Sequence, residues 1–194
     1  MTVQAIETRY AGHRFRSRLE ARWAVFFDTL GIKWEYEPQG YVIDGTPYLP
    51  DFLLADCGTW VEVKGNGADL DRRLMSAAAG HLPEMPYRWE AGPRLLILGP
   101  IPEPRTDGDW GWLGLTPWTD DRYGDGVESH RYGFGLYRKN RRPWVLLETS
   151  STTPYDCGDP ADGWLVPALD PTEPSAERGY AAARSARFEH GRAS

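Results

Sequence analysis

Three charged side chains lie close together in the stretch Tyr48–Lys64, whose sequence is YLPDFLLADCGTWVEVK. Asp51 follows a proline before one apolar run, and Glu62 and Lys64 lie two residues apart on a second run. Since side chains alternate across a strand, Glu62 and Lys64 point to one face and Val63 to the other. Two carboxylates and an ammonium at one spot need compensation, because unpaired buried charge is costly. A divalent metal would supply it, since hard cations bind carboxylate oxygens.

The same stretch has the pattern of a β-hairpin. Its two apolar runs, Phe52–Leu54 and Trp60–Val63, are joined by a turn-prone Asp-Cys-Gly segment. An alternative to a metal site is a surface hairpin in which Asp51 belongs to a turn and Glu62 and Lys64 form a cross-strand pair.

Pro50-Asp51, ten intervening residues and then Glu62-Val63-Lys64 resemble the active-site signature of the PD-(D/E)XK nuclease superfamily, which has the restriction-endonuclease-like fold. The resemblance covers roughly residues 14–100. It implies that Asp51, Glu62 and the backbone carbonyl of Val63 hold Mg²⁺ or Mn²⁺, with Lys64 beside the attacking water. The implied activity is phosphodiester hydrolysis in DNA by an endonuclease or structure-specific nuclease. The resemblance also implies a small stand-alone member of the kind that phages and mobile elements encode.

Glu20 has two interpretations that the sequence leaves open. It lies in a predicted helix over Ser17–Leu30, which Gly31 ends. Ser17 and Glu20 have the spacing of a capping box, in which Glu20 only caps the helix. The resemblance instead implies that Glu20 is an accessory catalytic acid that binds or orients metal.

Basic residues in three segments are candidate nucleic-acid contacts, since cations bind phosphates and neighbouring aromatic rings stack on bases. They are Arg16 before the first helix, Arg72 and Arg73 in a predicted helix over Asp69–Leu82, and Arg138, Lys139, Arg141 and Arg142 in the segment HRYGFGLYRKNRR. The alternatives are a solvated charged face for the arginines and a β-hairpin whose aromatic residues, Tyr132, Phe134 and Tyr137, belong to the core.

The other patterns predict an α/β core over residues 1–100. A strand over Ile32–Glu37 is continued by Tyr41–Ile43, and Arg94–Leu98 is a buried strand. Glu37 is a minor site candidate that alternation places on the outer face. The order helix, three strands, helix, strand matches the fold that the resemblance implies, a mixed central sheet flanked by helices.

Residues 101–194 are rich in Trp and Gly and form a predicted extension of strands and loops. Strands are predicted over Tyr132–Tyr137 and Trp144–Leu147, followed by a helix that Gly191 ends. This helix either packs on the core or mediates self-association as a homodimer.

The composition limits the classes of function. A net charge of −6 argues against a protein that coats DNA by charge alone. No apolar run reaches the ~18 residues of a membrane span, and the N-terminus lacks the apolar middle of a signal peptide, so a cytoplasmic protein is expected. The alternatives to a nuclease are a non-catalytic nucleic-acid-binding or regulatory protein that keeps the scaffold, and an assembly protein with a Trp-rich interface.

Overall fold

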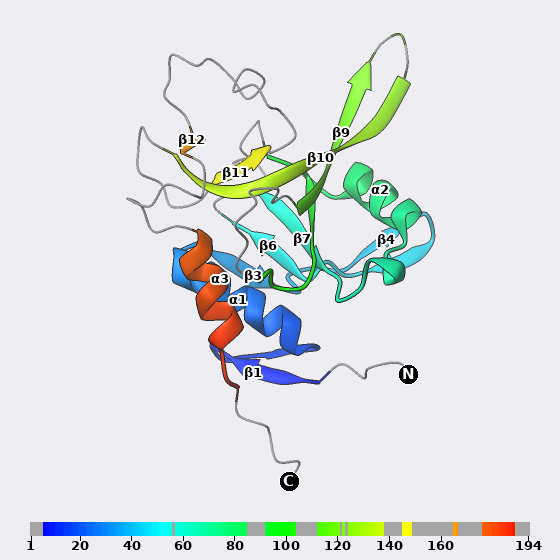
Figure 1. Ribbon diagram of the computed structural model, residues 1–194. Coiled ribbons are helices and arrows are strands. Elements are labelled where there is room, and N and C mark those ends of the chain that lie inside the picture. The colour runs from blue at the N-terminus through cyan, green and yellow to red at the C-terminus, as the bar shows by residue number, and fades with distance from the viewer. Residues whose placement is uncertain are drawn as a thin grey trace.

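The computed structural model describes residues 6–55, 57–84, 92–103, 112–120, 122, 124–137, 145–148, 165–166 and 176–188. This part of the chain is a mixed α/β structure with three α-helices and a mixed sheet (Figure 1). The elements in chain order are β1 (Thr8–Tyr10), β2 (His13–Phe15), α1 (Arg18–Leu30), β3 (Trp34–Tyr36), β4 (Tyr41–Ile43), β5 (Thr46–Tyr48), β6 (Phe52–Leu54), β7 (Thr59–Val63), a 3₁₀ turn η1 (Gly67–Asp69), α2 (Arg72–His81), β8 (Leu95–Leu98), β9 (Trp112–Asp120), β10 (Gly124–Tyr137), β11 (Val145–Glu148), β12 (Leu165–Val166) and α3 (Ala176–Ser185).

Helix α1 has the bounds that its sequence predicts. Ser17 is the N-cap, and Gly31 ends the helix with a φ of 73°, a left-handed conformation that favours glycine. Its apolar face, which includes Trp23, Phe26 and Phe27, is fully buried against the sheet. The predicted helix over Ser17–Leu30 is therefore confirmed, with Ser17 as the cap.

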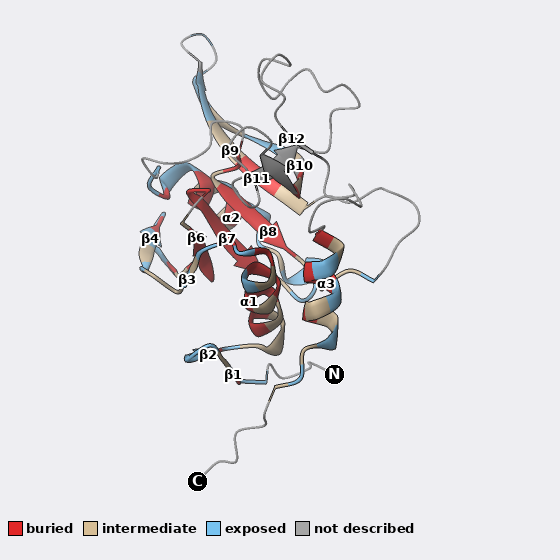
Figure 2. Cartoon of the chain, turned by 90° about the vertical axis from the view of Figure 1, so that its left-hand side faces the viewer, coloured by how far each residue is buried: buried red, intermediate tan, exposed pale blue. Residues whose placement is uncertain are grey.

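Within the sheet, the hairpin β6–β7 lies between β3 and β8. The hairpin is antiparallel, with Phe52 opposite Val61, and β7 pairs with β8 in parallel, with Val61 opposite Leu96. A parallel pair needs a crossover connection, which α2 supplies. Figure 2 shows that buried residues concentrate in β6, β7 and β8 and on α1. Both the predicted hairpin and the predicted buried strand are confirmed.

The helices lie on opposite faces of this sheet. Val61 and Val63 join the cluster of buried residues that contains α1 and α3, whereas Trp60 joins the cluster that contains α2. This is the alternation expected of a strand that is covered on both faces. It places the valines of β7 in the core with α1, and confirms the prediction that they face away from the polar side of the strand.

Two predictions for the first half of the chain are wrong in detail. The segment Tyr41–Ile43 does not continue β3 but pairs with β5 in a separate two-stranded sheet. Asp44 and Gly45 join these strands with φ values of 48° and 80°. Asp-Gly is a strong signal for a two-residue hairpin turn, so the sequence carried the information.

The helix predicted over Asp69–Leu82 begins later, at Arg72. Asp71 is the N-cap of α2, and its side chain accepts a hydrogen bond from the Leu74 N–H. Residues 67–69 form the separate turn η1, in which Asn66 takes the capping role. Competition between two caps therefore moved the helix start by three residues.

Beyond residue 101 the same sheet continues. The spatial order of its strands is β11-β10-β9-β8-β7-β6-β3, and β12 pairs with β10. Strand β9 was not predicted, because its sequence WLGLTPWTD is rich in turn-forming residues. It pairs with β8 along one edge and β10 along the other, so pairing outweighs its local preferences.

The other elements of the second half differ from the predictions mainly in length. Strand β10 is longer than the predicted Tyr132–Tyr137, and β11 corresponds to the predicted strand over Trp144–Leu147, of which Trp144 lies outside the described residues. Helix α3 ends at Ser185, before the predicted Gly191. Helix α3 packs closely on α1. The contact requires a glycine at position 179, because an added Cβ there would lie 2.7 Å from the Phe26 ring.

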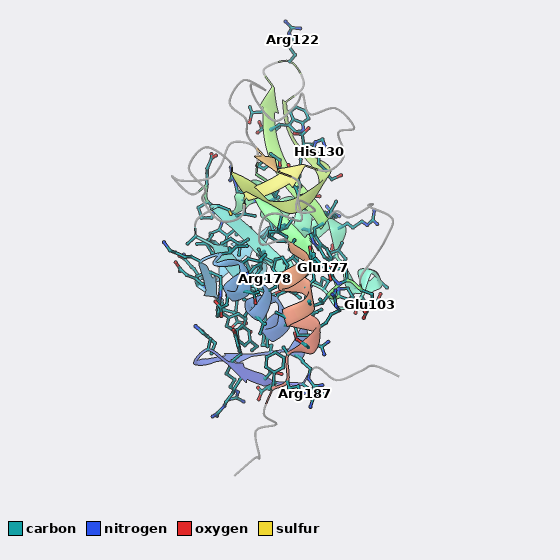
Figure 3. The ribbon with its side chains drawn as sticks, turned by 60° about the vertical axis from the view of Figure 1, so that its left-hand side comes forward. Glu103, Arg122, His130, Glu177, Arg178 and Arg187 are labelled. Carbon is teal, nitrogen blue, oxygen red and sulfur yellow. The ribbon has the colours of Figure 1, made fainter. Side chains whose placement is uncertain are left out.

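The hairpin β9–β10 projects from the body of the molecule. Its far end carries exposed residues, and Arg122 at the tip points away from the rest of the chain (Figure 3). Elsewhere along the hairpin, Gly126 leaves room for the Trp118 side chain, whose ring would lie 2.4 Å from an added Cβ. In the described part of the chain, no helix is both long enough and apolar enough to cross a membrane.

Gly114 in β9 allows the buried Tyr132 ring to lie across it, since an added Cβ would lie 2.2 Å from that ring and 2.8 Å from Pro93. We expect Gly114→Ala to lower the free energy of unfolding by about 2–3 kcal/mol, because the buried ring must move. Gly80→Ala is the control, since an added Cβ there meets open space on a helix and should stabilise slightly. Urea unfolding of both variants tests this, and equal stability of the two would contradict it.

Candidate functional site

Asp51 is fixed by the hairpin that it begins. Its N–H donates to the Val61 carbonyl at 3.0 Å, and its own carbonyl accepts from the Glu37 N–H at 2.9 Å. Its side-chain Oδ2 accepts a hydrogen bond from the Val63 N–H at 2.7 Å. The residue is 3% exposed. The register of β6 and β7 therefore places this carboxylate at the end of β7.

Glu62 and Lys64 lie at the same end of the hairpin. Glu62 is 6% exposed, and its Oε2 accepts a hydrogen bond from the Tyr48 hydroxyl at 2.9 Å. Its Oε1 lies 2.6 Å from the Lys64 ammonium. The Lys64 N–H donates to the Leu98 carbonyl at 2.8 Å, which anchors this residue to the end of β8. The parallel pair β7–β8 thus positions the lysine beside the carboxylate.

Glu20 lies in the first turn of α1, where Ser17 is the N-cap. Its N–H donates to the Ser17 hydroxyl oxygen, and that hydroxyl in turn donates to Glu20 Oε1 at 2.7 Å. Its Oε2 accepts from the Arg16 N–H at 3.1 Å and from the Tyr36 hydroxyl at 2.7 Å. The buried carboxylate also lies near enough to Asp51 for its charge to affect the pKa of that residue. The capping box is thus modified, since the Glu20 carboxylate accepts from the Ser17 hydroxyl and the Arg16 N–H, and its role toward a metal stays a prediction.

Arg16 joins Asp51 to a fourth carboxylate, that of Glu37. Its Nη2 lies 2.5 Å from Asp51 Oδ1, and its Nε lies 2.6 Å from Glu37 Oε1. The second contact is an ion pair by distance only, because no described residue donates a hydrogen bond to that buried Glu37 oxygen. Glu37 follows β3 with a φ of 45°, which is left-handed for a residue with a side chain. The turn after β3 thus brings a side chain inward that alternation had placed on the outer face.

Burial and crowding of acids raise the pKa of Asp51 to about 7. Burial is the largest cause, followed by the negative charge of Glu62 and, more weakly, that of Glu20. The Val63 N–H and the Arg16 guanidinium act in the opposite direction. Burial beside Glu62 likewise raises the pKa of the Tyr48 hydroxyl, which therefore stays protonated as a donor. The charge on Asp51 is thus only partly compensated by the protein.

The donor set of this site suits a hard divalent cation. Two buried carboxylates, Asp51 and Glu62, and the Val63 carbonyl offer oxygen ligands, and Mg²⁺ in proteins commonly takes one or two carboxylates and keeps several waters. Within the described ranges, no three His, Cys, Asp or Glu side chains gather closely enough to hold a metal by themselves. The residues therefore fit a site with two carboxylates, in which Arg16 and Lys64 contact carboxylate oxygens in this conformation.

The remaining predicted contacts are exposed on α2, buried in the core or outside the described residues. Arg72 and Arg73 are exposed on the first turn of α2. Tyr132 and Phe134 are buried, so these two rings belong to the core, as the alternative to base stacking predicts. Four predicted nucleic-acid contacts lie outside the described residues: Arg138, Lys139, Arg141 and Arg142.

A surface pocket lies at the opposite end of β3 and β6. Its lining includes His13, Lys33, Trp34 and Ala55 but neither Asp51 nor Glu62. The register of β3 and β6 separates the two ends, since Trp34 pairs with Leu54 and Tyr36 with Phe52. The pocket is therefore distinct from the carboxylate cluster.

Two tyrosines of the site were not predicted. Tyr48 donates to Glu62 and Tyr36 donates to Glu20, so each hydroxyl orients one acid. The proximity of Tyr48 to Asp51 in the sequence was the available signal. The Tyr36 contact depends on how α1 packs beside β3, which has no local signal.

We expect Tyr48→Phe to weaken Mn²⁺ binding about tenfold, because Glu62 loses the donor that orients it. The free energy of unfolding of the metal-free protein should fall by about 1–2 kcal/mol, since a buried carboxylate loses a hydrogen bond. Calorimetric titration and urea unfolding measure the two effects. Tyr41→Phe is the control, since Tyr41 packs beside Trp60 instead. Equal metal affinity in both variants would exclude the orienting role.

The site is thus built from side chains of several segments that the fold brings together: Arg16, Glu20, Tyr36, Glu37, Tyr48, Asp51, Glu62 and Lys64. No protein-family model, no curated protein and no solved structure matches this chain.

Proposed function

We propose that this chain is a metal-dependent nuclease that hydrolyses phosphodiester bonds, with DNA as its substrate. The observation that carries the proposal is the convergence of two buried carboxylates and an ammonium, those of Asp51, Glu62 and Lys64, at one end of the hairpin β6–β7. Such an arrangement leaves Asp51 with a strongly raised pKa, which is typical of functional sites.

The element order supports assigning the restriction-endonuclease-like fold of the PD-(D/E)XK superfamily. Helix α1 precedes the strands β3, β6 and β7, and α2 then leads to β8, which pairs in parallel with β7. In this assignment Asp51 and Glu62 belong to the hairpin β6–β7, and Glu20 approaches Asp51 from α1. Fold alone does not decide a substrate, so the proposal depends on the side chains of the site.

Asp51, Glu62 and the Val63 carbonyl would hold Mg²⁺ or Mn²⁺, with Glu20 near enough to bind or orient a further ligand. The metal would supply Lewis acidity at the scissile phosphate and help to make water a nucleophile near neutral pH. Within the protein, the Tyr48 hydroxyl and the Val63 N–H hold one oxygen each of Glu62 and Asp51. Each carboxylate therefore presents its second oxygen in a defined direction.

Lys64 would position the attacking water and offset negative charge that develops on the phosphate. Its ammonium is already held beside Glu62, and its side chain is 31% exposed, so solvent and substrate can reach it. Arg16 is more exposed, at 54%, and would contact a phosphate of the substrate. Positioned cations of this kind stabilise the charge of a phosphoryl transition state.

The direct experiment is cleavage of supercoiled plasmid, single-stranded DNA and RNA in the presence of Mg²⁺ or Mn²⁺. We expect metal-dependent cutting of DNA that EDTA stops and that Asp51→Asn abolishes. Cleavage that persists in EDTA or in the variant would refute the assigned site. Cleavage of RNA alone would retain the chemistry and change the substrate.

A non-catalytic nucleic-acid-binding protein is the second candidate, and one observation favours it. Arg16 and Lys64 already contact the two carboxylates, so the site is partly neutralised without metal. In that case we expect DNA binding that neither metal nor Asp51→Asn changes, and no cleavage of any substrate. A filter-binding assay beside the cleavage assay separates the two functions.

A further inference from the structure

Arg16 has a fixed backbone and a side chain that can move. Its N–H is 3.1 Å from Glu20 Oε2 and 3.0 Å from the Tyr36 hydroxyl oxygen, which anchors the residue immediately before α1. Its side chain is nevertheless 54% exposed, whereas that of its partner Asp51 is 4% exposed. The guanidinium can therefore leave Asp51 without disturbing the start of the helix.

The guanidinium occupies an oxygen that a metal would need. Asp51 Oδ2 already accepts from the Val63 N–H, and Oδ1 is the atom that faces Arg16 at 2.5 Å. A cation bound to Oδ1 and the Arg16 charge would repel each other at this distance. Binding of a divalent cation thus requires the guanidinium to move aside or to share the oxygen.

Glu37 provides a second partner that keeps the guanidinium at the site. Its Oε1 lies 2.6 Å from Arg16 Nε and accepts no hydrogen bond from a described residue. Its backbone is tied to Asp51, because the Glu37 N–H donates to the Asp51 carbonyl. A small rotation of Arg16 would therefore exchange the Asp51 contact for a hydrogen bond to Glu37, so the cation stays beside the carboxylates.

We propose that Arg16 is an exchangeable counter-ion of Asp51: it competes with the divalent cation for Oδ1 and, once displaced, binds a substrate phosphate while Glu37 holds it. This inference rests on the proposed function, since it presumes a metal at Asp51 and Glu62. It assigns to one side chain two opposite effects, one on metal affinity and one on DNA affinity. A structural role would weaken both.

The test measures metal and DNA binding separately in Arg16→Gln. We expect Mn²⁺ affinity, measured by calorimetry without DNA, to increase about three- to tenfold, because the competing charge is gone. Affinity for a short DNA duplex, measured by fluorescence anisotropy in Ca²⁺, should fall about three- to tenfold, because a phosphate contact is lost. In Arg16→Lys both affinities should return part of the way to their wild-type values, because lysine restores the positive charge but lacks the planar guanidinium.

Arg14→Gln is the matched control, since it removes the same charge from an exposed residue that pairs with Glu7 outside the site. It should change neither affinity. Unchanged or weaker Mn²⁺ binding in Arg16→Gln, with wild-type binding that Asp51→Asn abolishes, would overturn the exchange and leave the proposed function intact. Absence of Mn²⁺ binding in both the wild type and Arg16→Gln would overturn both.

Discussion

Replacing Lys64 by Met is expected to reduce the rate of metal-dependent DNA cleavage by at least about 100-fold while the protein still binds Mn²⁺. The substitution keeps most of the length and apolar stem of the side chain and removes only the charge. That charge lies 2.6 Å from Glu62 Oε1, at the end of β7 where the water and phosphate would meet. Removing a positioned group that acts on the transition state commonly costs two to four orders of magnitude in rate, roughly.

Lys33→Met is the matched control for this loss. Lys33 lies before β3, at the end of that strand away from Asp51, and lines the separate pocket. The control removes the same charge and should retain wild-type cleavage. Loss of Mn²⁺ binding or of folding in Lys64→Met, seen by calorimetry and circular dichroism, would point to a structural role for the lysine. Full cleavage by Lys64→Met would eliminate it from the chemistry.

Asp51→Asn is expected to abolish cleavage and yet to stabilise the metal-free protein at pH 8 by about 1–3 kcal/mol. The pKa of Asp51 is raised from 3.8 to about 7, so the folded protein resists its ionisation. A shift of that size, which already includes the attraction to Arg16, corresponds to roughly 4 kcal/mol, and the gain is reduced because the Asn NH₂ group faces the Arg16 donors where Oδ1 accepted. The Asn carbonyl can still accept the hydrogen bond from the Val63 N–H.

The pH dependence of this effect has a definite sign. Below about pH 4 the carboxyl is protonated in both states, so the variant gains nothing. Between about pH 4 and 7 the folded wild type keeps a proton that the unfolded chain has released, and its free energy of unfolding falls as pH rises. Above about pH 7 the carboxyl is ionised in both states, and the free energy of unfolding of the wild type falls no further. The advantage of Asp51→Asn should therefore grow through this window and then level off.

Urea unfolding of both proteins at several pH values, with and without Mn²⁺, measures this advantage. Mn²⁺ should stabilise the wild type and leave the variant unchanged, because a ligand that binds only the folded state raises its stability. A variant that is less stable than the wild type at pH 8 without metal would show that the Asp51–Arg16 contact outweighs the burial of the charge. It would contradict the assigned cause of the pKa shift.

The sequence by itself determined the local elements around the site. Ser17 and Gly31 define the ends of α1, because a side-chain cap and a left-handed glycine act within one helical turn. The two apolar runs around the Asp-Cys-Gly turn predict the hairpin, and strand alternation separates Glu62 from Val63. These features depend on neighbours within a few residues, so one chain suffices to recognise them.

Only the tertiary structure decided which side chains surround Asp51. Arg16 precedes α1 and the neighbours Tyr36 and Glu37 lie at the end of β3, and no spacing in the sequence joins these two segments to the carboxylates. Residues Trp112–Asp120 likewise form strand β9 because they pair with the edge of β8, although their own local preferences favour turns. Contacts of this kind depend on packing over long sequence separations, where local propensity carries little information. The sequence marks Arg16 as a candidate phosphate contact and Glu37 as a minor site candidate, but only the folded chain shows that Arg16 joins Glu37 to Asp51.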